Sequence, residues 1–158
     1  MSTNPQTSIY EIERGKPMPS RNHSALQARL SAIMIVNYDE QYNIYSEPDL
    51  ELDGWKSVPD LTIYEKEPLF FEEDIIRLNK PPLCAIEILS AQQGMKGIID
   101  KISIYFEKGV QSCWFVVPYL KQIIIYTSPK NHKTYSDGMT FKDEKLNISF
   151  SLKDLFRK

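Results

Sequence analysis

Apolar residues recur along the chain with two different periods, and each period predicts one kind of element. Between residues 24 and 38 they recur at three- and four-residue spacing, which predicts an amphipathic helix. Ser24, with Gln27 three residues later, fits a capping box at the start of this helix. Residues 95–108 show the same period, and Gly109 is a good stop signal. We therefore expect two main helices.

Short apolar runs between these helices predict strands. Residues 43–66 read as two short strands with a turn at Asp53-Gly54, the second starting directly after Pro59-Asp60. The run LCAIEIL, residues 83–89, suits a central strand. Further strands are expected over 112–118, 122–128, 134–141 and 145–152, the last two antiparallel at one edge.

The remaining segments are less regular. Residues 1–8 are polar and expected to be disordered, whereas 8–18 alternate weakly around Gly15, which favours a hairpin. Residues 66–80 are consistent with either a short helix or a covering loop, and 152–158 with a last short turn. Residues 9–158 thus predict one domain of the α/β (α+β) class, with a central mixed β-sheet flanked by helices.

Charge is distributed unevenly over the 158 residues, whose net charge is −2. Residues 1–120 hold 11 basic and 17 acidic side chains, a balance of −6, whereas residues 121–158 hold 8 and 4, a balance of +4. The basic C-terminal part could meet phosphates or could be a solvated basic face. No apolar run approaches the roughly 20 residues of a membrane span, and no secretory signal is recognisable. We expect no membrane association and a cytoplasmic location.

Cysteine usage and motif content narrow the chemistry further. Cys84 and Cys113 both lie in apolar runs, so we expect two reduced core thiols, and their spacing matches no zinc pattern. The chain has no glycine-rich phosphate loop, no G-x-S-x-G and no convincing Cys/His pair. An enzyme based on one of those devices is therefore not supported.

Glu87 stands in the middle of the predicted central strand. A buried lone carboxylate costs several kcal/mol unless it is paired, neutralised or bound to a metal. Glu87 could lie on an exposed face, pair with a lysine or arginine, or lie near the strand end. Asp60 adds a second carboxylate at a strand edge, and Lys101 flanks the apolar stripe of the following helix. Two carboxylates and an ammonium at one end of a sheet can bind a divalent ion and orient a water.

Several short motifs in order resemble one family. They are P-D at 59–60, E-x-L-S at 87–90, D-K-x-x-x-Y at 100–105, and G-V followed by W-F-V-V-P within 109–118. Together with the Y-E-x-x-x-G segment at 10–15, they resemble the Uma-two family of putative restriction endonucleases, within the PD-(D/E)xK nuclease superfamily. The resemblance spans roughly 10–156 and implies a restriction-endonuclease-like fold.

The resemblance also implies roles for matching residues. Asp60 and Glu87 would be catalytic ligands of Mg²⁺ (or Mn²⁺), with the backbone carbonyl of Ile88 as a further ligand and Glu11 as an additional acidic group. The usual lysine of E-x-K would stand at 89, where this chain has leucine. Lys101 would take its place from the following helix and help to orient or activate the attacking water.

Other matching positions would contact substrate. His23 and Gln27 could touch the same pocket or form a solvent-facing cap, and Ser90 and Lys96 flank the expected site. Phosphates would be met by Lys96, Lys121, Lys130 and Lys133. Family members often read E-x-L-S-P-S, whereas this chain reads EILSAQQGMKGIID, so the loop beside the proposed metal departs from the pattern.

The sequence therefore predicts an Mg²⁺-dependent endonuclease that hydrolyses phosphodiester bonds in DNA. A homodimer is expected, because two-fold symmetry matches the two strands of a duplex. The alternative is a catalytically inactive dimeric nucleic-acid-binding or scaffold protein on the same fold, since a fold does not fix a function.

Overall fold

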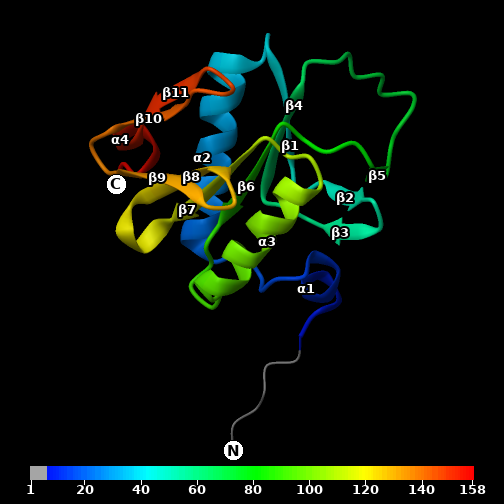
Figure 1. The fold of residues 1–158 in the computed structure, drawn as a ribbon, viewed down its shortest axis with the longest axis horizontal. Helices are drawn as coiled ribbons and strands as arrows, with labels where there is room; N and C mark the ends of the chain where they lie inside the picture. Colours follow the sequence, from blue (N-terminus) through cyan, green and yellow to red (C-terminus); the bar gives the residue numbers. More distant parts are fainter. Residues whose placement is uncertain (1–6) are drawn as a thin grey trace, which may run out of the picture.

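A six-stranded mixed sheet forms the centre of the structure, a computed structural model that describes residues 7–158. In spatial order its strands are β1 (Tyr42–Ser46), β4 (Leu61–Glu65), β6 (Cys84–Ile88), β7 (Ser112–Val117), β8 (Gln122–Ser128) and β9 (Asn131–Ser136) (Figure 1). β6 and β7 are parallel, and all other neighbours are antiparallel. The predicted central mixed sheet is thus confirmed.

Two helices cover opposite faces of this sheet. α2 (Arg21–Tyr38) lies behind the sheet and α3 (Met95–Glu107) in front of it in the view of Figure 1. α3 connects β6 to β7, as parallel neighbours require a crossover connection. Both helices were expected from the spacing of apolar residues.

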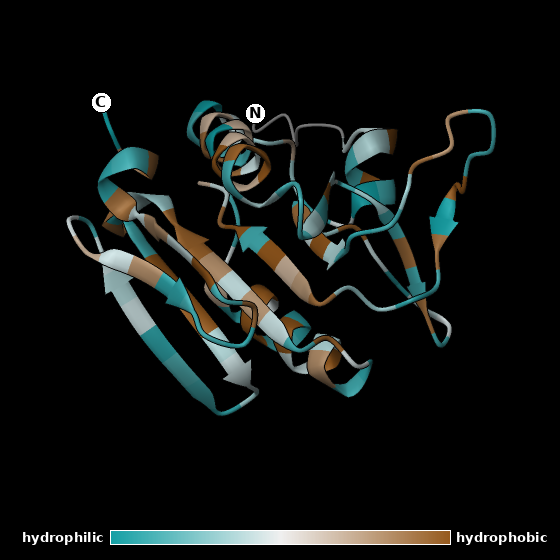
Figure 2. Ribbon diagram, turned by 90° about the horizontal axis from the view of Figure 1, so that it is seen from above, coloured by the Kyte–Doolittle hydropathy of each residue, from teal (hydrophilic) through white to brown (hydrophobic). Residues whose placement is uncertain are grey.

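Strand alternation divides the core into two layers. Ile86 of β6 packs in the cluster of α2, whereas Ala85 packs in the cluster of α3 together with Ile98 and Ile102. Because successive side chains of a strand point to opposite faces, Glu87 lies on the α3 face. Figure 2 shows how hydrophobic residues concentrate in the central strands between the helices.

Smaller elements complete the domain. A three-stranded sheet contains β3 (Trp55–Ser57), β2 (Asp49–Leu52) and β5 (Arg77–Leu78), and a hairpin contains β10 (Thr140–Asp143) and β11 (Ile148–Ser151). The other helices are α1 (Ile9–Arg14), the 3-10 turn η1 (Pro118–Leu120) and α4 (Leu152–Leu155). Within residues 7–158, no helix combines the length and apolarity needed to cross a bilayer.

The predicted hairpin over residues 8–18 is wrong, because this segment contains α1. Ser8 caps the helix in a reciprocal capping box with Glu11. The S-x-x-E spacing of these two residues is a helix-start signal. The predicted disorder of residues 1–8 falls almost entirely on residues 1–6, which lie outside the described residues.

The start of the second helix also differs from the prediction. α2 begins at Arg21, and its cap is Ser20, whose hydroxyl accepts from the backbone N–H of His23. Ser24 lies inside the first turn, where its N–H donates to the carbonyl of Ser20. The helix therefore begins one turn earlier than the Ser24–Gln27 spacing indicated.

Two strand predictions are corrected in number. Residues 43–66 contain parts of four strands instead of two, although the expected turn at Asp53-Gly54 joins β2 to β3. Residues 134–141 do not form one strand, because a turn at Gly138 separates β9 from β10. The segment 66–80 is a loop that ends in β5, and its side chains include Phe71, which is 89% exposed.

Asp143 is a buried hydrogen-bond centre at the end of β10. Its Oδ2 accepts from Ser112 Oγ at 2.6 Å and from Trp114 Nε1 at 2.8 Å, and its Oδ1 accepts from the N–H of Leu146 at 3.2 Å. One carboxylate thus ties the β10–β11 hairpin to the central strand β7. No feature of the sequence indicated this role.

We expect Asp143→Ala to lower the free energy of unfolding by about 2–4 kcal/mol, because it leaves buried donors without acceptors. Asp137→Ala is the control, because Asp137 is exposed and its ion pair with Lys121 is long, at 3.9 Å. This variant should change the free energy of unfolding by less than about 0.5 kcal/mol. Urea unfolding measures both. Equal stability of the two variants would contradict the structural role of Asp143.

Candidate active site

Two buried carboxylates face each other where β4 and β6 lie side by side. Asp60 directly precedes β4, and Glu87 belongs to β6, its neighbour in the sheet. Asp60 is fully buried and Glu87 is 2% exposed. Such groups stay ionised only with compensating charges and hydrogen bonds, so their partners define the site.

Asp60 collects four partners. Its Oδ1 lies 2.8 Å from Arg14 Nη2, 2.7 Å from Lys16 Nζ and 3.1 Å from His23 Nε2. Its Oδ2 accepts the backbone N–H of Ile88 at 2.7 Å. Both oxygens of this carboxylate are therefore engaged.

Glu87 is held by two lysines and a tyrosine. Its Oε2 lies 3.0 Å from Lys16 Nζ, and its Oε1 lies 2.7 Å from Lys101 Nζ. The hydroxyl of Tyr105 donates to the same Oε1 at 2.9 Å, and lies 2.7 Å from Ser57 Oγ. Lys16 thus bridges the two carboxylates, because its ammonium contacts one oxygen of each.

The bridging lysine comes from the segment that contains α1. Gly15 ends this helix in the left-handed conformation, with φ of 69°, and Arg14 and Lys16 on either side of it are both buried. Arg14 also contacts Glu47 at 2.5 Å through Nε and donates to the carbonyl of Pro17 through Nη1. The turn at Gly15 therefore allows two neighbouring cations to enter the site from one side.

The surrounding charges determine the ionisation of the pair. Burial acts to raise the pKa of Asp60, but the hydrogen bond with His23 and the charge of Lys16 outweigh it and hold that pKa well below its usual range. Burial acts to lower the pKa of Lys16, but the charges of Glu87 and Asp60 raise it above the usual value. Burial and the charge of Glu87 raise the pKa of Tyr105, which keeps its hydroxyl proton.

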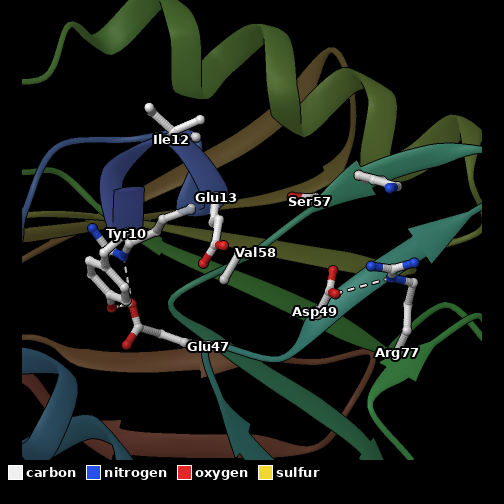
Figure 3. Close-up of a pocket in the computed structure, with 11 residues that line it drawn as sticks. Tyr10, Ile12, Glu13, Glu47, Asp49, Ser57, Val58 and Arg77 are labelled. Carbon is white, nitrogen blue, oxygen red and sulfur yellow. Dashed lines mark hydrogen bonds and ion pairs between the residues drawn. The ribbon is translucent and has the colours of Figure 1, made fainter. Parts of the chain in front are cut away.

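An open pocket of about 860 Å³ lies next to this centre. Its lining includes Tyr10, Glu47 and Ser57, which Figure 3 labels, and also Arg14. Arg14 also contacts Asp60, and Ser57 contacts the tyrosine that binds Glu87. The buried carboxylates therefore lie behind the wall of this pocket.

The structure brings together four of the residues selected from sequence. Glu87 contacts Lys101 directly, and Asp60 contacts His23 and is linked to Glu87 through Lys16. His23 is 1% exposed, so it is not a solvent-facing cap. Its Nδ1 is buried without a hydrogen-bond partner among the described residues.

Other selected residues lie outside this set of contacts. Both carboxylate oxygens of Glu11 are used locally, by the N–H groups of Ser8 and Met18, so the structure does not bring Glu11 to Asp60 and Glu87. Lys96 is exposed and pairs with Asp100. Among the described residues, half-buried Gln27 and Ser90, which is buried beyond the end of β6, are not hydrogen-bonded to either carboxylate. Ile88 is the exception, because its backbone N–H donates to Asp60, whereas the prediction concerned its carbonyl.

The three C-terminal lysines predicted to meet phosphates do not gather in one place. Lys121 lies next to the Val117–Gln122 pairing, at the end of the sheet where β6 also ends. Lys130 lies in the β8–β9 turn at the opposite end. Lys133 is in register with Ile125, which packs on the α2 face, away from Glu87.

Sequence reasoning missed Arg14, Lys16, Glu47 and Ser57. Tyr105 was predicted only as part of a motif and of the apolar face of its helix. Its position one turn after Lys101 was a usable signal, because residues four apart lie on the same helix face. Arg14 and Lys16 carried no such signal. The sequence predicted a hairpin for their segment, and a hairpin would not direct these two side chains to Asp60 and Glu87.

In this arrangement the residues do not fit a divalent ion. Mg²⁺ requires oxygen ligands at about 2.1 Å, but the position shared by Asp60 and Glu87 holds the ammonium of Lys16. Among the described residues, no three His, Cys, Asp or Glu side chains form a group suited to a metal. This arrangement gives no support to metal binding by Asp60, Glu87 and the Ile88 carbonyl, which stays a prediction from the family resemblance.

Comparison with solved structures shows that this fold is shared with another protein. A crystal structure described as a putative nuclease belonging to DUF820, from Anabaena variabilis ATCC 29413, matches with a TM-score of 0.77 and 22% identity. The match covers 89% of this chain and 83% of that chain. No curated protein matches.

The family follows from the sequence itself. The family described as "Uma2: Putative restriction endonuclease" matches residues 10–152. The chain therefore belongs to the Uma2 family, in agreement with the resemblance noted from its motifs.

The low pKa of Asp60 predicts acid sensitivity of the fold. A carboxyl whose pKa is depressed by folding contributes its full stability above its unfolded pKa of about 3.9, and loses it as the pH falls through the folded value. We expect the free energy of unfolding to decrease as the pH is lowered below about 4. In Asp60→Asn the free energy of unfolding should decrease less steeply with falling pH.

Urea unfolding at a series of acidic pH values measures these slopes. The absolute stability of Asp60→Asn should also be lower, because three polar partners lose a charged acceptor. An unchanged acid slope in the variant would mean that Asp60 does not carry the effect.

Proposed function

We propose that this protein is an endonuclease that hydrolyses phosphodiester bonds in DNA. Membership of the Uma2 family supports a nuclease. The observation that carries the proposal is the contact of Glu87 with Lys101, together with the link through Lys16 to Asp60, which contacts the pocket-lining Arg14. A carboxylate pair with an adjacent ammonium is suited to proton transfer and to stabilising charge on a phosphate.

Lys101 is the group best placed to meet solvent and substrate. Its side chain is 21% exposed, whereas those of Lys16 and Arg14 are 3% and 2% exposed. An ammonium there could contact a phosphate oxygen or orient a water towards it, while Glu87 accepts its hydrogen bond. Tyr105 would be a positioning residue, because it holds the same oxygen of Glu87.

Magnesium or manganese as a cofactor remains part of this proposal, with no catalytic step assigned to it. The choice of DNA and a homodimeric assembly are likewise proposals, based on the family and on the symmetry of a duplex. A cytoplasmic location is supported by two free, buried cysteines, because reduced thiols are usual in that compartment.

A second candidate is a nucleic-acid-binding or scaffold protein without catalytic activity. The specific observation in its favour is Lys16, whose buried ammonium contacts both carboxylates. A site already neutralised in this way can be a structural ion-pair network, because such networks also perturb pKa values.

We expect Glu87→Gln and Asp60→Asn each to reduce plasmid cleavage by about 100-fold or more, because each removes one carboxylate of the proposed centre. Glu107→Gln, on the exposed side of α3, is the control and should cleave like the wild-type protein. The assay compares nicking with Mg²⁺, with Mn²⁺ and with chelator, after circular dichroism has shown that each variant is folded.

Two results would reject the endonuclease. One is cleavage by Glu87→Gln within about threefold of wild type, which is less than a 1 kcal/mol change in barrier. The other is folded wild-type protein that binds DNA without cutting it under any of these conditions, which is the result expected of the second candidate.

Lys101→Met should lower kcat by about tenfold or more and leave the fold intact, because the side chain is partly exposed and Glu87 keeps two other partners. Steady-state cleavage of a short labelled duplex separates kcat from KM. Partial recovery in Lys101→Arg is expected, since a positive charge returns. A change confined to KM would show that Lys101 only binds DNA.

A further inference from the structure

The position shared by Asp60 and Glu87 has room for one cation. Lys16 Nζ lies 2.7 Å from Asp60 Oδ1 and 3.0 Å from Glu87 Oε2. An ion coordinated by the same two oxygens would lie about 2.1 Å from each, and would therefore overlap the ammonium nitrogen. A divalent ion and Lys16 cannot both occupy this position.

The charge balance of the site also favours replacement of Lys16 by a divalent ion over binding of the ion beside Lys16. Lys16 is 7% exposed as a residue and its partners are almost fully buried, so an extra positive charge would not be screened by water. Besides the His23 imidazole, which contacts Asp60, the described contacts pair three carboxylates with three side chains that carry a full positive charge: Asp60, Glu87 and Glu47 with Arg14, Lys16 and Lys101. Adding two charges without losing one would unbalance a buried network. Exchange for Lys16 is electrostatically better than addition.

The segment that carries Lys16 forms several ion pairs with the rest of the domain. Several apolar side chains of residues 9–19 are exposed, including Ile9 at 75%, Ile12 at 68% and Met18 at 51%. The polar contacts that join its side chains to the rest of the domain include the ion pairs of Arg14 and Lys16, and a hydrogen bond from Tyr10 to Glu47. Ile9, Ile12 and Met18 would therefore lose little burial if Lys16 were withdrawn.

We propose that Lys16 is the resident cation of the Asp60–Glu87 pair and competes with divalent ions for it. The ammonium closes the pair to Mg²⁺ or Mn²⁺, and a divalent ion enters only when Lys16 leaves. The exchange rests on the proposed function, because it would regulate metal access to the same site. Its test measures ion binding and requires no catalytic activity.

The test measures Mn²⁺ binding by electron paramagnetic resonance and calorimetry on the full chain. Lys16→Ala should bind Mn²⁺ at least about tenfold more tightly than wild type, because the ion no longer has to displace a paired ammonium. Lys101→Ala is the matched control: it removes an equal charge from the other oxygen of Glu87 but leaves the shared position filled. The Mn²⁺ affinity of Lys101→Ala should rise by less than about threefold, because the ion would still have to displace Lys16.

A double variant ties the gain to this site. Lys16→Ala with Glu87→Gln should lose the added Mn²⁺ affinity. Equal affinity of Lys16→Ala and wild type, or equal gains in Lys16→Ala and Lys101→Ala, would overturn the proposal. The same holds if Mn²⁺ binds neither wild type nor a folded Lys16→Ala.

The wild-type protein supplies a second measurement if Lys16→Ala does not fold. Lys16 should resist an amine-labelling reagent in metal-free protein and become labelled when Mn²⁺ is added at tens of millimolar, as read by mass spectrometry of its peptide. Exposed Lys96 should be labelled equally in both conditions. Labelling of Lys16 that does not change with Mn²⁺ would overturn the proposal. Loss of DNA cleavage in Glu87→Gln is independent of these results, so failure of the nuclease and failure of the exchange are separable.

Discussion

Two negative charges, those of Asp60 and Glu87, are buried side by side where β4 pairs with β6, and the rest of the domain must compensate for them. An unpaired carboxylate in such a position is strongly destabilising, so Asp60 and Glu87 require cations that reach them from elsewhere in the chain. Those cations come from two places, the turn after α1 and the inner face of α3. The requirement thus links the N-terminal segment to the centre of the sheet over 71 residues of sequence.

The two carboxylates are anchored differently, and the difference has chemical meaning. Asp60 has both oxygens engaged, including one by the backbone N–H of Ile88, so its orientation is fixed by the sheet itself. Glu87 is held only by side chains, and one of them, Lys101, reaches towards solvent. A group whose partners can move independently is easier to reorganise during a reaction than one tied to the backbone.

Much of the fold could be predicted from the sequence, because long apolar periodicities define α2, α3 and the central strands. The convergence of Asp60, Glu87 and Lys101 was also predictable, since a strand followed by a helix returns the helix to the same sheet. The roles assigned to these residues stay predictions. Lys16 could not be placed, because its position depends on the left-handed turn at Gly15 and on contacts with residues distant in sequence.

The crossover through α3 has a consequence for how this family can vary. Lys101 and Tyr105 are positioned by the packing of Ile98 and Ile102 against the sheet, and not by the loop that precedes the helix. The departure from the family pattern noted in the sequence covers residues 91–97, which include most of that loop and the first residues of α3. The length and composition of the loop can drift during evolution while the charged centre keeps its geometry, so divergence there is a poor guide to whether the centre has been retained.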